Sequence, residues 1–382
     1  MSSTAIQPIL PLALRPGDTI GFVSPSARLN DLLPAFVTRA VQALESLGYT
    51  VKIFWTPTTT RLTVSQSISH RLQELHAAFT DPSVRAIVCT FGGANGTELL
   101  PYLLNPPPSS ESDSQKFITP AIIRANPKIF IGYSDISVLH WWLASQTGLR
   151  TFYGPTAIAE LGAAPAPMQF TIDNLLRVIT NPAPAGPLPR SEHYAPKAPP
   201  LFTAPDDTSP PELAPTPKWI WLRNVKGKGR LYGGCLGVVV RMAGVQPIVP
   251  ADWSKHIVFV ETAMAEDLSK GHLLHNVQRN IADLLAQGVL ANPAGLVIGR
   301  AFGYDSEAER KELERVVREV LCPEVEGEVE GKFSLSHPPY PILMHVDIGH
   351  TSPHLTLPFG ALASLDSDKD EFAILEAGVC SN

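Results

Sequence analysis

The sequence has no cluster of basic residues and carries no net positive charge. Lys and Arg together number 30 against 36 Asp and Glu, which gives a formal net charge of −6 over 382 residues. A protein that binds the phosphate backbone of a nucleic acid needs clustered Lys and Arg. The charge balance therefore argues against a nucleic-acid partner.

Cysteine is scarce, and no two cysteines form a CxxC pair. The four are scattered at Cys89, Cys235, Cys322 and Cys380. This pattern argues against the usual zinc and disulfide frameworks and fits a reducing cytosol. Cys89 and Cys235 stand in apolar contexts, so we expect both to be small buried residues. No group of His, Cys and Asp has the spacing of metal ligands, so we expect no metal and no cofactor.

Long hydrophobic runs are also missing. No stretch reaches the roughly 18 consecutive apolar residues that indicate a transmembrane helix, and the N-terminus lacks the charged and apolar regions of a signal peptide. We therefore expect a cytoplasmic protein with no membrane partner. The apolar fraction of 44% and the charged fraction of 17% are ordinary for a globular protein, and the length favours two domains.

Strand patterns alternate with helix patterns in the first half of the chain. Such alternation predicts an open parallel sheet with helices on both faces, as in Rossmann-like and flavodoxin-like α/β folds. Ligands bind such sheets beyond the carboxyl ends of the strands. Two loops fall at such ends, the glycine-rich "FGGANG" at 91–96 and "IGYSD" at 131–135. The strand patterns cover 18–27, 50–55 and 84–91, and the helix patterns cover 32–49 and 67–82.

Two proline-rich segments interrupt the pattern. Residues 105–115 read as a Pro/Ser-rich insertion, and residues 181–217 as a longer, proline-dense linker. We take the longer one as the domain boundary. It separates an N-terminal α/β domain, residues 1–180, from a smaller β-rich C-terminal domain, residues 218–382. In the second domain, helix patterns cover 271–290 and 309–321.

Ser134 stands on a sharp corner between a buried strand pattern and an apolar helix pattern. One interpretation is that Ser134 and Asp135 cap the helix. The other is a nucleophile elbow, in which a strained strand-to-helix turn projects a hydroxyl above the sheet. The usual elbow reads GxSxG, and here Ile136 replaces the second glycine. The corner alone does not decide between the two.

A serine nucleophile needs a base and an acid that orients the base. His350 follows a strand and a glycine within a polar loop, where a functional histidine is presented. His345 and His354 compete with it on position, whereas we expect His140 to be packed in the core. Glu261 ends the buried run "HIVFVE", where a carboxylate needs partners. It is either the orienting acid or a structural partner of an Arg or of backbone amides.

At these residues the chain resembles the LD-carboxypeptidase family of serine peptidases. The resemblance rests on "LRPGDTIGFVSPSA", "FGGANGTELLPYL", "IGYSDISVLH", "IVFVET" and "VDIGHTSPHLTLPFGA", in that order along nearly the whole chain. It implies a Ser–Glu–His triad of Ser134, Glu261 and His350, with the active site between two domains. It also implies a cytoplasmic homodimer that needs no metal. One departure is Gly233-Gly234-Cys235-Leu236, where family members often read Gly-Gly-Asn-Leu.

The resemblance implies hydrolysis of an amide bond in a small peptide or an aminoacyl amide. The oxyanion would bind the backbone amide of Asp135 and one amide from the loop Gly92-Gly93, where the absence of a side chain lets the substrate approach. Arg241 is a candidate for binding the substrate carboxylate.

Trp219 and Trp221 would share one face of a strand, and there they either stack on the substrate or belong to the core. Two alternatives to hydrolysis stay open. One is an acyltransferase, cyclase or amidase of natural-product metabolism that uses the same triad, and the other is a non-catalytic binding protein.

Overall fold

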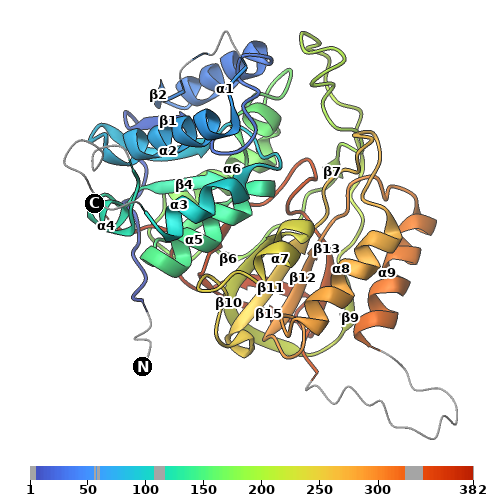
Figure 1. Ribbon diagram of the computed structural model, residues 1–382. Helices are drawn as coiled ribbons and strands as arrows, with labels where there is room; N and C mark the ends of the chain where they lie inside the picture. Colours follow the sequence, from blue (N-terminus) through green and yellow to red (C-terminus); the bar gives the residue numbers. More distant parts are fainter. Residues whose placement is uncertain (1–5, 56, 58–60, 107–116, 323–338, 382) are drawn as a thin grey trace, which may run out of the picture.

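The computed structural model describes residues 6–55, 57, 61–106, 117–322 and 339–381. Most of the Pro/Ser-rich stretch predicted at 105–115 lies outside these residues. The chain folds around two main β-sheets, which stand side by side in Figure 1. The first is built mainly from the N-terminal half and the second mainly from the C-terminal half. Together they give the α/β fold with a second β-rich sheet that the sequence predicts.

The first sheet has six strands in the order β14-β5-β4-β3-β1-β2. Strands β5, β4, β3, β1 and β2 are parallel, and β14 pairs antiparallel with β5. The parallel sheet predicted from the alternating pattern is therefore confirmed. The strands are β1 (Thr19–Val23), β2 (Thr50–Ile53), β3 (Val84–Cys89), β4 (Ile129–Gly132), β5 (Thr151–Tyr153) and β14 (Leu357–Phe359).

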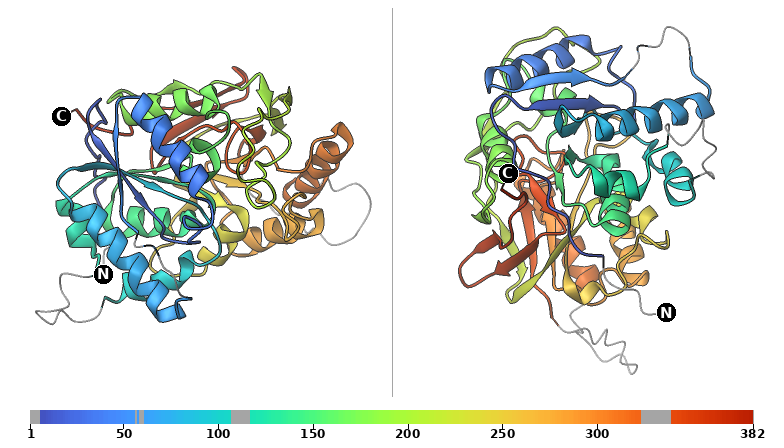
Figure 2. Two further views of the ribbon diagram at one scale, coloured as in Figure 1. Left: turned by 90° about the horizontal axis from the view of Figure 1, so that it is seen from above. Right: turned by 90° about the vertical axis from the view of Figure 1, so that its left-hand side faces the viewer.

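Helices cover both faces of this sheet, as Figure 2 shows. Alternate residues of a strand point to opposite faces, so β3 contributes to two separate cores. Ala86 and Val88 pack under α1 and α6, while Ile87 and Cys89 pack under α2 and α5. The helices are α1 (Pro34–Ser46), α2 (Val64–Thr80), α3 (Leu100–Leu104), α4 (Pro120–Ala125), α5 (Ser137–Thr147) and α6 (Gln169–Ile179).

The second sheet has eight strands in the order β6-β16-β15-β10-β11-β12-β13-β9. Its four central strands, β10 to β13, are parallel, and the outer strands pair antiparallel. The strands are β6 (Gly186–Pro187), β9 (Ile220–Arg223), β10 (Lys226–Cys235), β11 (His256–Glu261), β12 (Gly295–Gly299), β13 (Ile342–Val346), β15 (Leu362–Asp366) and β16 (Glu371–Ile374). Helices α7 (Leu236–Met242), α8 (Leu274–Ala286) and α9 (Glu307–Leu321) pack on it.

The two sheets are joined where α5 meets the carboxyl end of β10. Trp141 Nε1 on α5 donates a hydrogen bond to the Gly233 carbonyl oxygen at 2.8 Å. Ser137 Oγ accepts one from the Cys235 amide at 3.1 Å. Gly234 must lack a side chain here, because a Cβ atom would lie 2.2 Å from Ser137 Oγ. The helix that follows Ser134 is thereby fixed to the second sheet.

The proline-rich segment 181–217 is only partly exposed. Its middle, residues 200–213, is almost entirely exposed and projects away from both sheets between β7 (His193–Tyr194) and β8 (Ala214–Pro215) (Figure 1). A proline-dense linker would be exposed along its whole length, but Leu188, Ser191 and Tyr194 are buried. Proline does not prevent such packing at a sheet edge, where β6 pairs with β16 through backbone groups.

Candidate active site

The corner at Ser134 has the backbone strain that a nucleophile elbow requires. Ser134 begins a single 3₁₀ turn, η2 (Ser134–Ile136), directly between β4 and α5, and its φ is +63°. Few non-glycine residues adopt a positive φ, and those that do are held by their surroundings. Here the Ser134 amide donates to Tyr153 Oη at 3.2 Å, and its carbonyl accepts from Ser137 Oγ at 2.6 Å. Ser134 is partly exposed.

Glu261 and His350 form a doubly hydrogen-bonded pair. Glu261 ends β11, and its Oε2 accepts from His350 Nδ1 at 2.7 Å and from the His350 amide at 3.2 Å. The Glu261 side chain is fully buried and that of His350 is 9% exposed. Gly349 has a φ of +79°, and a Cβ atom there would lie 2.1 Å from Glu261 Cγ. Only glycine lets the loop that carries His350 come this close.

Each partner shifts the pKa of the other. Burial alone would raise the pKa of Glu261, but the charge and hydrogen bonds of His350 and Tyr153 lower it below its usual value. Burial alone would lower the pKa of His350, but the adjacent Glu261 carboxylate raises it above its usual value. The pair therefore consists of a carboxylate that stays ionised and an imidazole of enhanced basicity.

Tyr153 connects this pair to the Ser134 backbone. Its Oη donates to Glu261 Oε1 at 2.6 Å while accepting from the Ser134 amide. Nearby, the Tyr133 ring lies edge-on to the His350 ring, with centroids 5.0 Å apart, and Tyr133 Oη donates to Glu160 Oε1 at 2.8 Å. Our sequence reasoning missed both tyrosines, because Tyr153 lies on a strand of three residues that carries no distinctive pattern.

The residues predicted for the oxyanion hole lie around the Ser134 side chain. A Cβ atom on Gly92 would lie 2.7 Å from Ser134 Cβ and 3.5 Å from the Asp135 amide nitrogen. Gly93 has a φ of +135°, in the region that favours glycine. The loop that follows β3 therefore runs directly past the serine hydroxyl and the amide of the next residue.

The Asp135 side chain holds three segments together below the corner. Its buried carboxylate accepts from Ser26 Oγ at 2.6 Å, from the Gly96 amide at 2.6 Å and from Arg241 Nη2 at 3.1 Å. Ser26 follows β1, Gly96 ends the glycine-rich loop and Arg241 lies on α7. The Arg241 side chain remains 49% exposed, so part of its guanidinium is open to a ligand.

The three other histidines considered from the sequence have different surroundings. His140 is buried as predicted, with Nδ1 2.7 Å from Thr151 Oγ1 and Nε2 2.8 Å from the Gly132 oxygen, and burial lowers its pKa to about 4. His345 Nε2 pairs with Glu314 Oε1 at 2.7 Å. His354 is buried against the Tyr133 ring, and neither ring nitrogen has a hydrogen-bond partner among the described residues.

The two tryptophans lie at the edge strand β9 or beside it. Trp219 is buried beneath the Arg190 guanidinium, which lies 4.2 Å from the ring centroid. Trp221 Nε1 donates to Asp370 Oδ1 at 2.7 Å. Both rings therefore lie at the edge of the second sheet, and the burial of Trp219 favours its core interpretation over substrate stacking.

Cys235 is buried as predicted, but its position beside the pair was not foreseen. Its Sγ and one ligand atom each of Glu261 and His350 all lie within 4.8 Å of one another. Burial and the negative charge of Glu261 raise the pKa of the thiol well above its usual value. The register of the second sheet pairs Cys235 with Glu261, and the sequence pattern alone does not reveal this register.

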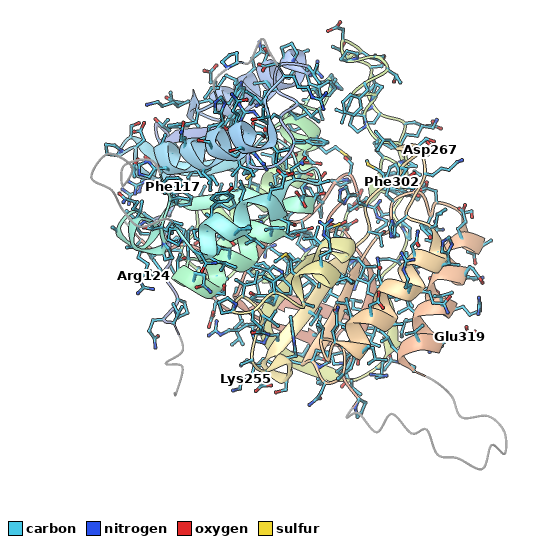
Figure 3. All side chains as sticks on the ribbon, in the orientation of Figure 1. Phe117, Arg124, Lys255, Asp267, Phe302 and Glu319 are labelled. Atoms are coloured by element: carbon cyan, nitrogen blue, oxygen red, sulfur yellow. The ribbon has the colours of Figure 1, made fainter. Side chains whose placement is uncertain are left out.

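The candidate residues lie at the carboxyl ends of the central strands. In Figure 3, Asp267 and Phe302, which follow β11 and β12, lie at this end of the second sheet, whereas Lys255, which precedes β11, lies at the opposite end.

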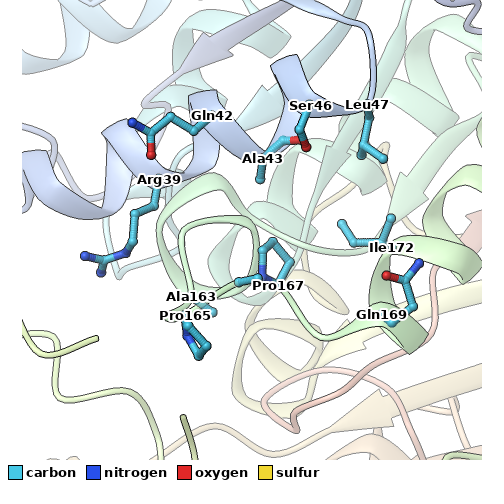
Figure 4. Close-up of a pocket in the computed structure, with 11 residues that line it drawn as sticks. Arg39, Gln42, Ala43, Ser46, Leu47, Ala163, Pro165, Pro167, Gln169 and Ile172 are labelled. Carbon is cyan, nitrogen blue, oxygen red and sulfur yellow. The ribbon is translucent and has the colours of Figure 1, made fainter. Parts of the chain in front are cut away.

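Figure 4 shows a separate pocket of about 310 Å³, lined by α1 and by residues 163–172. Its lining includes none of Ser134, Glu261 and His350.

A parallel α/β sheet that carries a strained serine corner, beside a second sheet that carries a glutamate–histidine pair, defines a serine-type hydrolase. Residues 20–154 match the LD-carboxypeptidase N-terminal domain, and residues 228–365 match the LD-carboxypeptidase C-terminal domain. The chain belongs to the LD-carboxypeptidase family, and it is a serine-type peptidase. No helix in the described part of the chain is long and apolar enough to cross a membrane.

The relatives of this chain include a microcin self-immunity protein and proteins named as carboxypeptidases. The microcin C7 self-immunity protein MccF of Escherichia coli is 28% identical over 97% of this chain and 96% of its own length. A protein of Bacillus subtilis named for carboxypeptidase activity on murein peptides is 26% identical over 97% and 95%. The structure of MccF without ligand superposes with a TM-score of 0.80 at 26% identity, covering 97% of this chain and 100% of that one. MccF has also been solved with aspartyl sulfamoyl adenosine and, as a mutant, with adenosine monophosphate.

Proposed function

We propose that Ser134, Glu261 and His350 are the catalytic triad of this peptidase. The observation that carries the proposal is a continuous set of hydrogen bonds from the Ser134 amide through Tyr153 Oη to Glu261 and from there to His350. This set of bonds supports a common site for the proposed acid, the proposed base and the strained serine. Neither His140 nor His345 offers an equivalent arrangement, because both of His140's nitrogens are occupied in the core and His345 pairs with Glu314.

The reaction follows from the roles of these groups. Ser134 Oγ attacks the scissile carbonyl carbon while its proton passes to His350 Nε2. The same proton then goes to the leaving amine, which departs and leaves an acyl-enzyme. Water repeats the sequence and releases the acid. Glu261 holds the proton on His350 Nδ1, so that Nε2 is the free base, and it stabilises the imidazolium that forms.

The oxyanion would be bound by the Asp135 amide and by an amide of the loop Gly92-Gly93. This is supported by the closeness of Gly92 to both Ser134 and the Asp135 nitrogen. One such donor is worth roughly 3–4 kcal/mol of transition-state stabilisation in other serine hydrolases. The Asp135 carboxylate, bonded to three segments, keeps that amide in place during the reaction.

For the substrate we propose a small molecule in which an acidic aminoacyl group is joined through an amide. The support is the likeness to MccF over the whole chain and the acidic aminoacyl nucleotide analogue bound by MccF. Arg241 would pair with the substrate carboxylate through the exposed part of its guanidinium. With the substrate carboxylate held at Arg241, the triad would cleave the amide bond of the substrate.

We further propose that residues 1–180 carry the nucleophile and residues 218–382 the acid and the base, with 181–217 between them. A cytoplasmic homodimer is the assembly that agrees with the family resemblance. Gel filtration with light scattering measures the assembly directly, and a monomer at micromolar concentration would contradict it.

A fluorophosphonate probe tests the nucleophile. It should label the wild-type protein once per chain and should fail on Ser134→Ala, which should also lose turnover by about a millionfold. Ser145→Ala is the matched control, because Ser145 lies on α5 with its Oγ bonded to the Trp142 oxygen. Equal labelling of Ser134→Ala and Ser145→Ala would reject the assignment.

Mass spectrometry of reactions with acidic aminoacyl amides, L,D-dipeptides and muropeptides would then identify the substrate.

A further inference from the structure

Three side chains of different chemistry converge where the second sheet meets the nucleophile corner. Cys235 ends β10, Glu261 ends the neighbouring β11, and the parallel register makes the two residues direct partners. Side chains of such partners point to the same face of a sheet. His350 completes the group from the loop after β13, and the three ligand atoms lie within 4.8 Å of one another.

A thiolate, a carboxylate and an imidazole together form a donor set that suits zinc. Zinc binds sulfur at about 2.3 Å and nitrogen or oxygen at about 2.0–2.2 Å, so ligand atoms around a tetrahedral ion stand about 3.5 Å apart. The group therefore needs movements of about 1 Å to enclose an ion. Magnesium and calcium, which prefer oxygen ligands, would not gain from the sulfur.

Without a metal, the Glu261 carboxylate is stabilised by hydrogen bonds from His350 and Tyr153, and binding of a cation would require the Cys235 thiol to lose its proton. Cys235 and Glu261 are buried, so once the thiol has lost its proton two negative charges would stand side by side away from water. A divalent ion would compensate both charges. Tyr153 Oη, which donates to Glu261 Oε1, would stay in place as the partner that orients the ligating carboxylate.

The geometry points to an inhibitory site for a thiophilic divalent cation of the zinc type, formed by Cys235, Glu261 and His350. On binding, the Cys235 thiol releases its proton to solvent and sulfur bonds the metal, while an imidazole nitrogen of His350 donates its lone pair. If that nitrogen is Nδ1, its hydrogen bond to Glu261 is broken and its proton moves by way of solvent to Nε2, so the ring becomes the Nε2–H tautomer. If it is Nε2, the base itself is occupied. In either case His350 no longer accepts the Ser134 proton, and this inhibitory consequence rests on the proposed triad.

Cobalt(II) is the probe for the binding step, because it takes zinc sites and reports sulfur ligation by a thiolate-to-metal charge-transfer band. Chelator-treated, full-length protein should develop this band with one equivalent of Co²⁺, and Zn²⁺ should abolish it. Cys235→Ser should lose the band and bind Zn²⁺ at least about 100-fold more weakly, since even the loss of an outer-shell partner costs 10–100-fold. Cys322→Ser is the control thiol, because the partly exposed Cys322 lies in contact with Arg223, and it should keep the band.

The inhibitory step is measured separately by fluorophosphonate labelling of Ser134. Zn²⁺ should slow labelling of the wild type and of Cys322→Ser, should leave labelling of Cys235→Ser unchanged, and should be reversed by chelator. Mg²⁺ at the same concentration should have no effect. No cobalt band, or an equal band in Cys235→Ser, would overturn the metal site whether or not Ser134 is the nucleophile. A normal cobalt band, together with fluorophosphonate labelling that Zn²⁺ does not slow, would overturn the inhibitory role of the site. Absence of any labelling without metal would instead count against the triad, while the cobalt spectrum would still decide the site.

Discussion

At the scale of single residues, Glu261 determines how basic His350 is. Its carboxylate raises the pKa of His350 above the usual value of about 6.5. In the proposed triad only the neutral imidazole can accept the Ser134 proton, so we expect turnover to be low at acid pH and to rise as the pH passes through this pKa. The midpoint of that rise reports the Glu261–His350 interaction directly.

We therefore expect Glu261→Gln to change the pH profile in two ways. Loss of the negative charge should lower the His350 pKa, so the rise in kcat/KM moves to lower pH. The plateau should fall by roughly 10⁴-fold, as the corresponding change does in a well-studied protease. Glu314→Gln is the matched control, since Glu314 pairs with His345 at the same 2.7 Å separation. Equal profiles for the two variants would show that Glu261 is not the orienting acid.

In the proposed triad Tyr153 would be a positioning residue, because it contacts the Glu261 carboxylate and the Ser134 backbone but not the reacting atoms. Tyr153→Phe should lower kcat by roughly 10–100-fold with little change in KM, since a hydrogen bond to a charged group contributes about 1.5–3 kcal/mol. Tyr232→Phe is the control, because it also loses a buried phenol hydrogen bond, but one that goes to the Ile248 oxygen and not to the triad. Steady-state kinetics should show normal kcat for this control. A matching loss in both variants would mean that Tyr153 serves stability alone.

At the scale of elements, the loop after β13 must pass unusually close to β11. Gly349→Ala would place a methyl group among the Glu261 side-chain atoms, so we expect loss of turnover and of more than about 3 kcal/mol in the free energy of unfolding. Gly360→Ala has nearly the same φ, +78°, but open space around its Cα. It should lose only about 1 kcal/mol through backbone strain. Urea unfolding and activity assays separate the two, and similar losses would reject the close approach as the cause.

The sequence predicted elements well where the pattern was long and locally determined. β1, β3 and β11 are buried apolar runs, and α9 carries a clear amphipathic pattern with a Ser306 capping box. Strands β5 and β14 span three residues each and have no signal of their own. Their formation depends on neighbours that are distant in the sequence.

The candidate site could likewise be predicted where it depends on local sequence pattern, but not where it depends on contacts between distant segments. The motifs allowed Ser134, Glu261 and His350 to be proposed because each ends or follows a recognisable strand. The closeness of Cys235 to Glu261 depends on strand register, and the role of Tyr153 depends on packing between the two sheets. Neither property can be derived from local pattern.

At the scale of the whole molecule, the segment 181–217 combines docked and projecting parts. Limited proteolysis should first cleave within residues 200–213, which are almost entirely exposed, because proteases need an accessible backbone. Residues 186–195 should resist, since Gly186 and Pro187 pair with β16 and Ser191 and Tyr194 are buried. Mass spectrometry of the first fragments decides the matter. Early cleavage within 186–195 would show that this part is not docked in solution.

The antiparallel strand β14 has a consequence for how the protein is made. A ribosome delivers the chain from its N-terminus, so β1 to β5 can assemble long before Leu357–Phe359 emerges. Until then the outer edge of β5, the strand that bears Tyr153, has no partner and is open to pairing with another nascent chain. The surroundings of the Ser134 corner are therefore completed only near the end of synthesis. Hydrolytic activity should appear late in translation, and chaperones should be needed most while that edge is bare.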